Sequence, residues 1–173
     1  NSDWETEGND RVDFNLPGEQ NTLIEKVLEI NPNAIIVLNT GSPVDMPWVN
    51  KAKSILQSWY AGQEYGDALF EILTGLVNPS GKLPTTFPKH IKDTPAYSCY
   101  PGENLQMSYD EKLLIGYKWY DRKKIEPLFH FGHGLSYTNF EYSNLRISNS
   151  DKNNFTCSFN IENVGDISGF EIS

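Results

Sequence analysis

Long apolar runs and basic residues are both scarce in this chain of 173 residues. A membrane-spanning helix needs about 20 consecutive apolar residues, and no stretch approaches that length, so we expect no membrane partner. Lysine and arginine total 14 against 23 acidic residues, which gives a formal net charge of −9. Nucleic acids and anionic membrane surfaces attract basic proteins. The charge balance therefore argues against a nucleic-acid partner.

Cysteine is scarce too. The two cysteines, Cys99 and Cys157, lie far apart in segments of different character, a pattern that favours free thiols over a disulfide framework. Cysteine usage alone does not decide the cellular compartment. We expect a soluble chain and slightly favour the cytoplasm over secretion. The chain opens with neither an initiator methionine nor a targeting pattern, and we expect it to be a piece or a processed product of something longer.

Phosphate-binding glycine loops are also lacking. The apolar run 34–38 predicts a strand buried on both faces, as in a parallel sheet. The loop after it, 39–43, has neither of the glycine spacings that cradle phosphates, which removes the support for a nucleotide-dependent enzyme. His130 and His133 lack the neighbouring ligands that a metal site needs. The sequence therefore implies no cofactor and no metal.

Helical and strand patterns alternate through the first part of the chain. Apolar spacing predicts three helices, at about 19–30, 46–53 and 64–73, two strands, at 34–38 and 54–60, and a β-rich run at 82–87. This order predicts an α/β fold with right-handed crossovers and a mostly parallel sheet. Ligands of such sheets sit at the carboxyl ends of the strands, which draws attention to the loops 39–42 and 61–64.

A different pattern begins near Phe140. Three short runs alternate polar and apolar residues between turn signals, at 142–148, 155–161 and 169–173. Such runs are typical of an antiparallel β-sandwich, but three strands cannot close one. We therefore expect an α/β sandwich domain over 1–139 and a truncated β-sandwich over 140–173.

The opening segment concentrates groups that could do acid–base chemistry. Residues 4–11, WETEGNDR, hold three acids, one tryptophan and one arginine. A carboxylic acid beside an apolar ring has a raised pKa and can act as a general acid, and an arginine can fix the geometry of an acid. A solvated acidic terminus is the alternative interpretation. No spacing of serine or cysteine with histidine supports nucleophilic catalysis by this chain alone.

Four segments together resemble a known family. They are WETEGNDR, VLNTGSPVDMPW, SWYAGQEYGDALFEILTGLVNPSGKLPTTFP and IGYKWYDRKKIEPLFHFGHGLSYTNFEYSNLRIS. In this order and spacing they resemble the C-terminal half of family 3 glycoside hydrolases of the β-glucosidase type. The resemblance implies a (β/α)₈ barrel that is absent here, the later part of a layered α/β sandwich over 1–139, and the first strands of a fibronectin type III-like domain over 140–173.

The resemblance also implies a reaction. It is the retaining hydrolysis of β-linked glucose, or a related sugar, from oligosaccharides or aryl glycosides, with the nucleophilic aspartate on the barrel. The E-G-x-D-R pattern implies Glu7 as the general acid/base, with Glu5 as the fallback, and Trp4 and Arg11 as substrate-binding candidates. The implied partners are the carbohydrate and the barrel, whereas assembly into a homo-oligomer is left open. We expect the chain alone to be inactive. The alternative is a non-catalytic α/β module that binds carbohydrate or a partner protein.

Overall fold

The computed structural model describes residues 11, 13–104, 106–149 and 154–172. The chain divides into two compact units, and each unit combines two stretches of sequence. The first unit comprises Asn1–Gly62 and Pro84–Gly132, and the second comprises Gln63–Leu83 and His133–Ser173. Each of these units combines two separate stretches, whereas the predicted domain boundary is a single cut after residue 139. That boundary stays a prediction.

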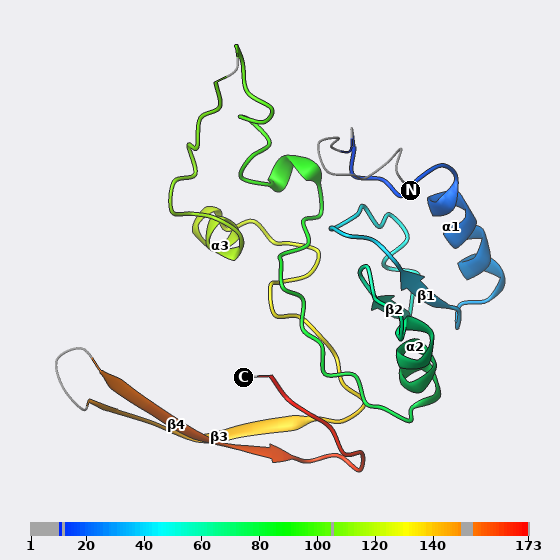
Figure 1. Cartoon of the computed structure of the whole chain (residues 1–173), viewed down its shortest axis with the longest axis vertical. Helices are drawn as coiled ribbons and strands as arrows, with labels where there is room; N and C mark the ends of the chain where they lie inside the picture. Colours follow the sequence, from blue (N-terminus) through cyan, green and yellow to red (C-terminus); the bar gives the residue numbers. More distant parts are fainter. Residues whose placement is uncertain (1–10, 12, 105, 150–153, 173) are drawn as a thin grey trace. The chain divides into compact units, whose positions relative to one another are not determined.

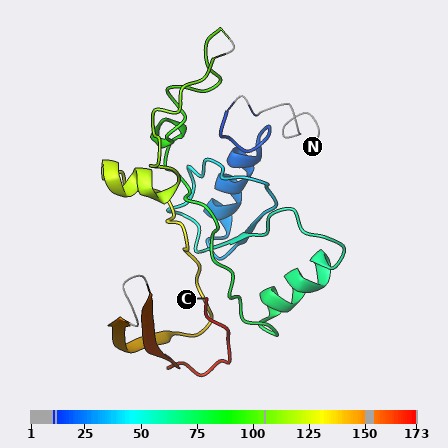
Figure 2. The same cartoon turned by 60° about the vertical axis from the view of Figure 1, so that its left-hand side comes forward.

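A parallel strand pair forms the centre of the first unit. β1 (Ile35–Leu38) pairs in parallel with β2 (Ser54–Gln57) in continuous register. α1 (Gln20–Ile30) precedes β1 and lies beside the pair in both views (Figure 1 and Figure 2). The helix predicted at about 19–30, the two strands that follow it and their parallel pairing are confirmed. The predicted burial of β1 on both faces is wrong, because Ile35 is 51% exposed while Ile36 and Leu38 are buried. One face of β1 is therefore open in the described part of the chain.

The predicted helix over 46–53 is also wrong. Consecutive turns take its place, held by bonds from the Val49 amide to the Met46 carbonyl and from the Lys51 amide to the Trp48 carbonyl. The physical reason lies in the burial pattern, since Val44, Met46 and Trp48 are 1%, 3% and 0% exposed. In an α-helix, residues two apart lie on different sides, so a helix would not bury all three side chains together. The indole of Trp48 also donates to the Asn21 amide oxygen at 2.8 Å, which ties this loop to α1.

The second stretch of the first unit contains a short 3₁₀ turn, Ile91–Asp93, and the helix α3 (Tyr117–Lys123). The β-rich run at 82–87 reduces to one antiparallel bridge, between Phe87 and Phe129. Phe87 is 1% exposed and packs edge-on against the rings of Trp59 and Phe129. Pro84 inside this run and Pro88 directly after it have no amide donor, which limits the pairing to a single bridge.

The second unit holds α2 and a long antiparallel hairpin (Figure 1). α2 (Tyr65–Thr74) ends at Gly75, whose φ of 76° is the left-handed conformation that glycine adopts freely. β3 (Phe140–Asn149) pairs with β4 (Phe155–Asn163), with an irregularity between Ser143 and Arg146. The helix stop and these two strands are confirmed. The strand predicted at 169–173 is wrong for its described residues, 169–172, which have no strand structure.

Asn78 joins three segments of the second unit. Its side-chain oxygen accepts hydrogen bonds from the Ser136 hydroxyl and the Tyr137 amide, at 2.9 and 2.8 Å, and its amide nitrogen donates to the Ser168 carbonyl at 3.2 Å. Asn78 is only 8% exposed. It therefore ties the chain just before β3 and the chain after β4 to the loop that follows α2.

A second polar contact reinforces this arrangement. The Lys82 ammonium group donates to the Gly134 carbonyl at 2.9 Å and lies 3.5 Å from the Glu171 carboxylate. A Cβ atom on Gly134 would overlap the carbonyl oxygen of Gly81, so the two loops approach each other closely only because Gly134 lacks a side chain. The sequence motifs N-P-S-G-K and F-G-H-G-L-S-Y therefore meet in one hydrogen-bonded cluster.

Candidate active-site region

Three of the predicted site residues, Trp4, Glu5 and Glu7, lie outside the described residues. Arg11 is described, and its guanidinium group is engaged by the protein. It donates to the Pro43 carbonyl at 2.7 Å and lies over the Phe14 ring, 5.7 Å from its centroid. A charge-assisted hydrogen bond and a cation–π contact together hold the arginine firmly. Arg11 thus fixes the end of the acidic segment 4–11 to the loop that follows β1.

A backbone contact strengthens this attachment. The Asp45 amide donates to the Phe14 carbonyl at 2.7 Å, so residues 11–14 meet residues 43–45 at two points. The loop itself is well held, because Gln57 at the end of β2 donates to the carbonyl of Thr40 at 3.0 Å. The Ser58 amide likewise donates to the Leu38 carbonyl at 2.8 Å. The carboxyl ends of β1 and β2 therefore come together at one edge, as parallel strands require.

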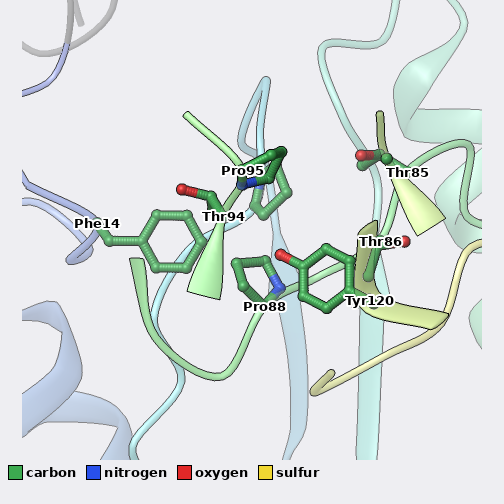
Figure 3. A pocket seen from close by; sticks show the side chains of 9 residues that line it. Phe14, Thr85, Thr86, Pro88, Thr94, Pro95 and Tyr120 are labelled. Carbon is green, nitrogen blue, oxygen red and sulfur yellow. The ribbon is translucent and has the colours of Figure 1, made fainter. Parts of the chain in front are cut away.

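A cavity of about 230 Å³ lies beside this attachment. Figure 3 shows the rings of Phe14 and Tyr120 on opposite sides of Pro88. The cavity brings together residues from five parts of the first unit, and its lining consists of Phe14, Pro43, Thr85, Thr86, Pro88, Thr94, Pro95, Gly116 and Tyr120. Aromatic rings and prolines dominate this lining. The cavity therefore suits an apolar group better than an ion.

Tyr120 is the main polar group of the cavity. Its side chain, on α3, is 5% exposed. Burial, together with the smaller effect of the nearby Asp93 carboxylate, raises the pKa of Tyr120 to about 12. The phenol is therefore neutral near pH 7 and can donate a hydrogen bond. None of the hydrogen bonds among the described residues uses its hydroxyl group.

Thr86 provides a second unused polar group. It is 7% exposed, and its hydroxyl oxygen is buried without a hydrogen-bond partner in the described part of the chain. Sequence reasoning found neither Thr86 nor Tyr120. Both residues lie in segments that carry the family resemblance, but neither segment has a sequence pattern that indicates a cavity.

Metal-binding groups do not gather in the described part of the chain, where no three histidine, cysteine or acidic side chains lie close enough to hold an ion. His130 instead lies 3.5 Å from the Glu126 carboxylate. Both cysteines are free thiols, as predicted. No helix among the described residues has the length and apolar character to cross a membrane.

Comparison with protein families gives one match that covers most of the chain. Residues 1–137 match the model of the glycosyl hydrolase family 3 C-terminal domain. Thermostable beta-glucosidase B of Acetivibrio thermocellus is 48% identical over an alignment of 173 positions, which covers 98% of this chain and 23% of that protein. A beta-glucosidase of Rhizobium radiobacter is 44% identical over an alignment of 176 positions, which covers 98% of this chain and 22% of that protein.

Solved structures agree with the sequence matches. A beta-glucosidase from Kluyveromyces marxianus superposes with a TM-score of 0.93 at 38% identity, over 98% of this chain and 21% of that one. DesR, a beta-glucosidase from Streptomyces venezuelae in complex with D-glucose, gives a TM-score of 0.89 at 42% identity, over 95% and 21%. The chain therefore spans between a fifth and a quarter of the length of these relatives.

Proposed function

Since this chain belongs to glycosyl hydrolase family 3, we propose that it is part of a retaining β-glucosidase that removes terminal β-linked glucose, or a related sugar, from oligosaccharides or aryl glycosides. The observation that carries the proposal is the family match over residues 1–137, together with relatives that are named beta-glucosidases. We also propose a division into an α/β sandwich over 1–139 and a fibronectin type III-like domain from 140. The start of β3 at Phe140 supports this boundary.

Glu7 is the proposed general acid/base. It first protonates the glycosidic oxygen as the leaving group departs, and then, as a base, activates the water that releases the sugar. Retaining hydrolysis needs a second carboxylate, the nucleophile, about 5 Å away. In this proposal an aspartate of a (β/α)₈ barrel outside this sequence supplies it, and the 173 residues alone are inactive.

Arg11 and Trp4 support Glu7 in the proposed site. Arg11 lies four residues after Glu7, and its contacts with Pro43 and Phe14 limit the movement of the segment's end. A precisely placed acid raises the rate because the proton transfer requires hydrogen-bond geometry. Trp4 shapes the leaving-group side of the site. Direct contact of Arg11 with the substrate, which the sequence predicts, is a separate role and stays a prediction.

The test uses the complete enzyme, with the barrel joined to this chain. Glu7→Ala should slow the hydrolysis of substrates with poor leaving groups by about 10²–10⁴-fold, because these need the proton. Glycosides of acidic phenols should lose far less in the first step. Glu5→Ala is the matched control and should leave both classes nearly unchanged. Equal losses on both classes for Glu7→Ala, or the same pattern for Glu5→Ala, would contradict the assignment.

A further inference from the structure

Gln57, the last residue of β2, holds the loop that follows β1. Its side-chain amide group donates to the Thr40 carbonyl at 3.0 Å and to the Thr40 hydroxyl oxygen at 3.2 Å. The Thr40 hydroxyl in turn donates to the Ser42 carbonyl at 3.0 Å. Gln57 and Thr40 are both half-buried, so water competes less for these bonds than at the surface. The consecutive hydrogen bonds therefore fix the backbone of residues 40–42 from the end of β2.

The next residue of the same loop holds Arg11. The Pro43 carbonyl, directly after Ser42, accepts the 2.7 Å hydrogen bond from the Arg11 guanidinium group. The direction of this carbonyl depends on the backbone before it, and a hydrogen bond weakens steeply when its angle is poor. Loosening residues 40–42 should therefore weaken the bond to Arg11. The contacts connect Gln57 to Arg11 through one loop.

One atom of Gln57 lowers the stability of the fold. The side-chain oxygen is buried and has no hydrogen-bond partner in the part of the chain that the structure describes. A buried acceptor without a partner is unfavourable, and an apolar side chain of similar shape avoids that loss. Packing alone therefore does not account for an amide at this position, whereas the two bonds that its nitrogen donates to Thr40 do.

We propose that Gln57 is a positioning residue for the acidic segment 4–11. It fixes the loop whose carbonyl binds Arg11, and Arg11 ends the segment that contains the proposed acid, Glu7. Proton transfer requires hydrogen-bond geometry, so a less firmly held segment transfers the proton more slowly. Gln57 takes no part in the chemistry itself. This inference rests on the proposed function and adds the residue that holds the attachment of its acid.

Hydrogen exchange tests the structural connection without any substrate. In the complete enzyme, Gln57→Met keeps the side-chain length and removes both bonds to Thr40. Exchange of the Asp45 amide, which donates to the Phe14 carbonyl beside the attachment, should become about five-fold faster, the change expected for one hydrogen bond. Gln20→Met, at an exposed glutamine at the start of α1, is the matched control and should leave this rate unchanged. An unchanged rate in Gln57→Met would overturn the proposal.

Turnover by the complete enzyme tests the functional consequence. Gln57→Met should lower kcat/KM about 10-fold for methyl β-D-glucoside, whose leaving group needs the proton, and by about two-fold or less for dinitrophenyl β-D-glucoside, whose leaving group does not. A residue that only stabilised the fold would lower both values equally, because it would change the amount of active enzyme. Thr40→Val should show the same selective loss, and Thr40→Ser, which keeps the hydroxyl group, should not. Equal losses on the two substrates, or none, would overturn the proposal.

Two comparisons separate this inference from the proposed acid. The double variant that combines Gln57→Met with Thr40→Val should be no slower than the slower single variant, because both remove the same connection. Additive losses would overturn the proposal. Glu7→Ala is measured beside these variants. A selective loss in Glu7→Ala without one in Gln57→Met refutes the positioning role and leaves the acid in place. The reverse result refutes Glu7 as the acid and leaves the positioning role of Gln57 in place.

Discussion

Replacing Asn78 by alanine should loosen the second unit without affecting the first. The substitution removes three hydrogen bonds, to Ser136, Tyr137 and Ser168. Each contributes about 1 kcal/mol net, so we expect a loss of about 3 kcal/mol. The loss should fall on the hairpin, because Asn78 holds the chain that enters β3 and the chain that leaves β4 at the open end of the pair.

Hydrogen exchange of the β3 and β4 backbone amides is the appropriate assay, because it reports local opening. A loss of about 3 kcal/mol corresponds to exchange that is faster by roughly 100-fold. Tryptophan fluorescence serves as an internal control, since Trp48, Trp59 and Trp119 all belong to the first unit. The urea midpoint of the unfolding transition that this fluorescence follows should stay unchanged.

Two further variants sharpen the result. Asn78→Asp keeps an acceptor for Ser136 and Tyr137 but loses the donor to the Ser168 carbonyl, so its effect should be intermediate. Asn15→Ala, at an exposed asparagine of the first unit, should leave exchange in the hairpin unchanged. If Asn78→Ala accelerates hairpin exchange by less than three-fold, the role assigned to this side chain is wrong.

Two predictions concern other parts of the molecule. Gly134→Ala should destabilise the second unit by about 1–3 kcal/mol, because the new methyl group overlaps the Gly81 carbonyl. Gly66→Ala, inside α2 and with open space around it, should stabilise that unit by about 0.5–1 kcal/mol. Amide exchange in β3 and α2 measures both changes, and effects of the same sign would contradict the reasoning. Tyr120 should make stability fall with rising pH between about 10 and 12, because the unfolded chain loses the phenol proton near its usual pKa of 10.0 while the folded protein keeps it until about 12. The urea midpoint of Tyr120→Phe should fall less than that of the parent over this range, and parallel curves would refute the shift.

The local parts of the fold follow from sequence patterns. Gly75 ends α2 in the left-handed backbone conformation, which glycine alone adopts without cost. The helix end is therefore predictable from the position of this glycine in the sequence. The parallel pairing of β1 with β2 was predicted from the two apolar runs and their place in an α/β order, although turns and not a helix connect the two strands. The segment at 46–53 misleads because turns bury Val44, Met46 and Trp48 together, and this burial depends on the space available and not on helix propensity.

The candidate site is harder to predict for a related reason. Phe14, Pro43, Thr86 and Tyr120 are separated by up to a hundred residues, and only the folded chain brings them to one cavity. No periodicity links them, and threonine or tyrosine in isolation indicates no particular role. The acidic segment with Glu7 has the opposite character, because its residues are adjacent in sequence and were recognisable as a motif. Its role stays a prediction, since Glu7 lies outside the described residues.

The interleaving of the two units has a consequence for synthesis of the chain. The stretch 63–83 leaves the ribosome between the two halves of the first unit, and its own partner, from residue 133, comes later still. At about 5–20 residues per second, residues 84–132 take roughly 2–10 s to appear. During that interval Asn78 lacks the partners that its side chain binds in the folded unit, Ser136, Tyr137 and Ser168. A ribosome-associated chaperone would have its greatest effect on this chain at that stage.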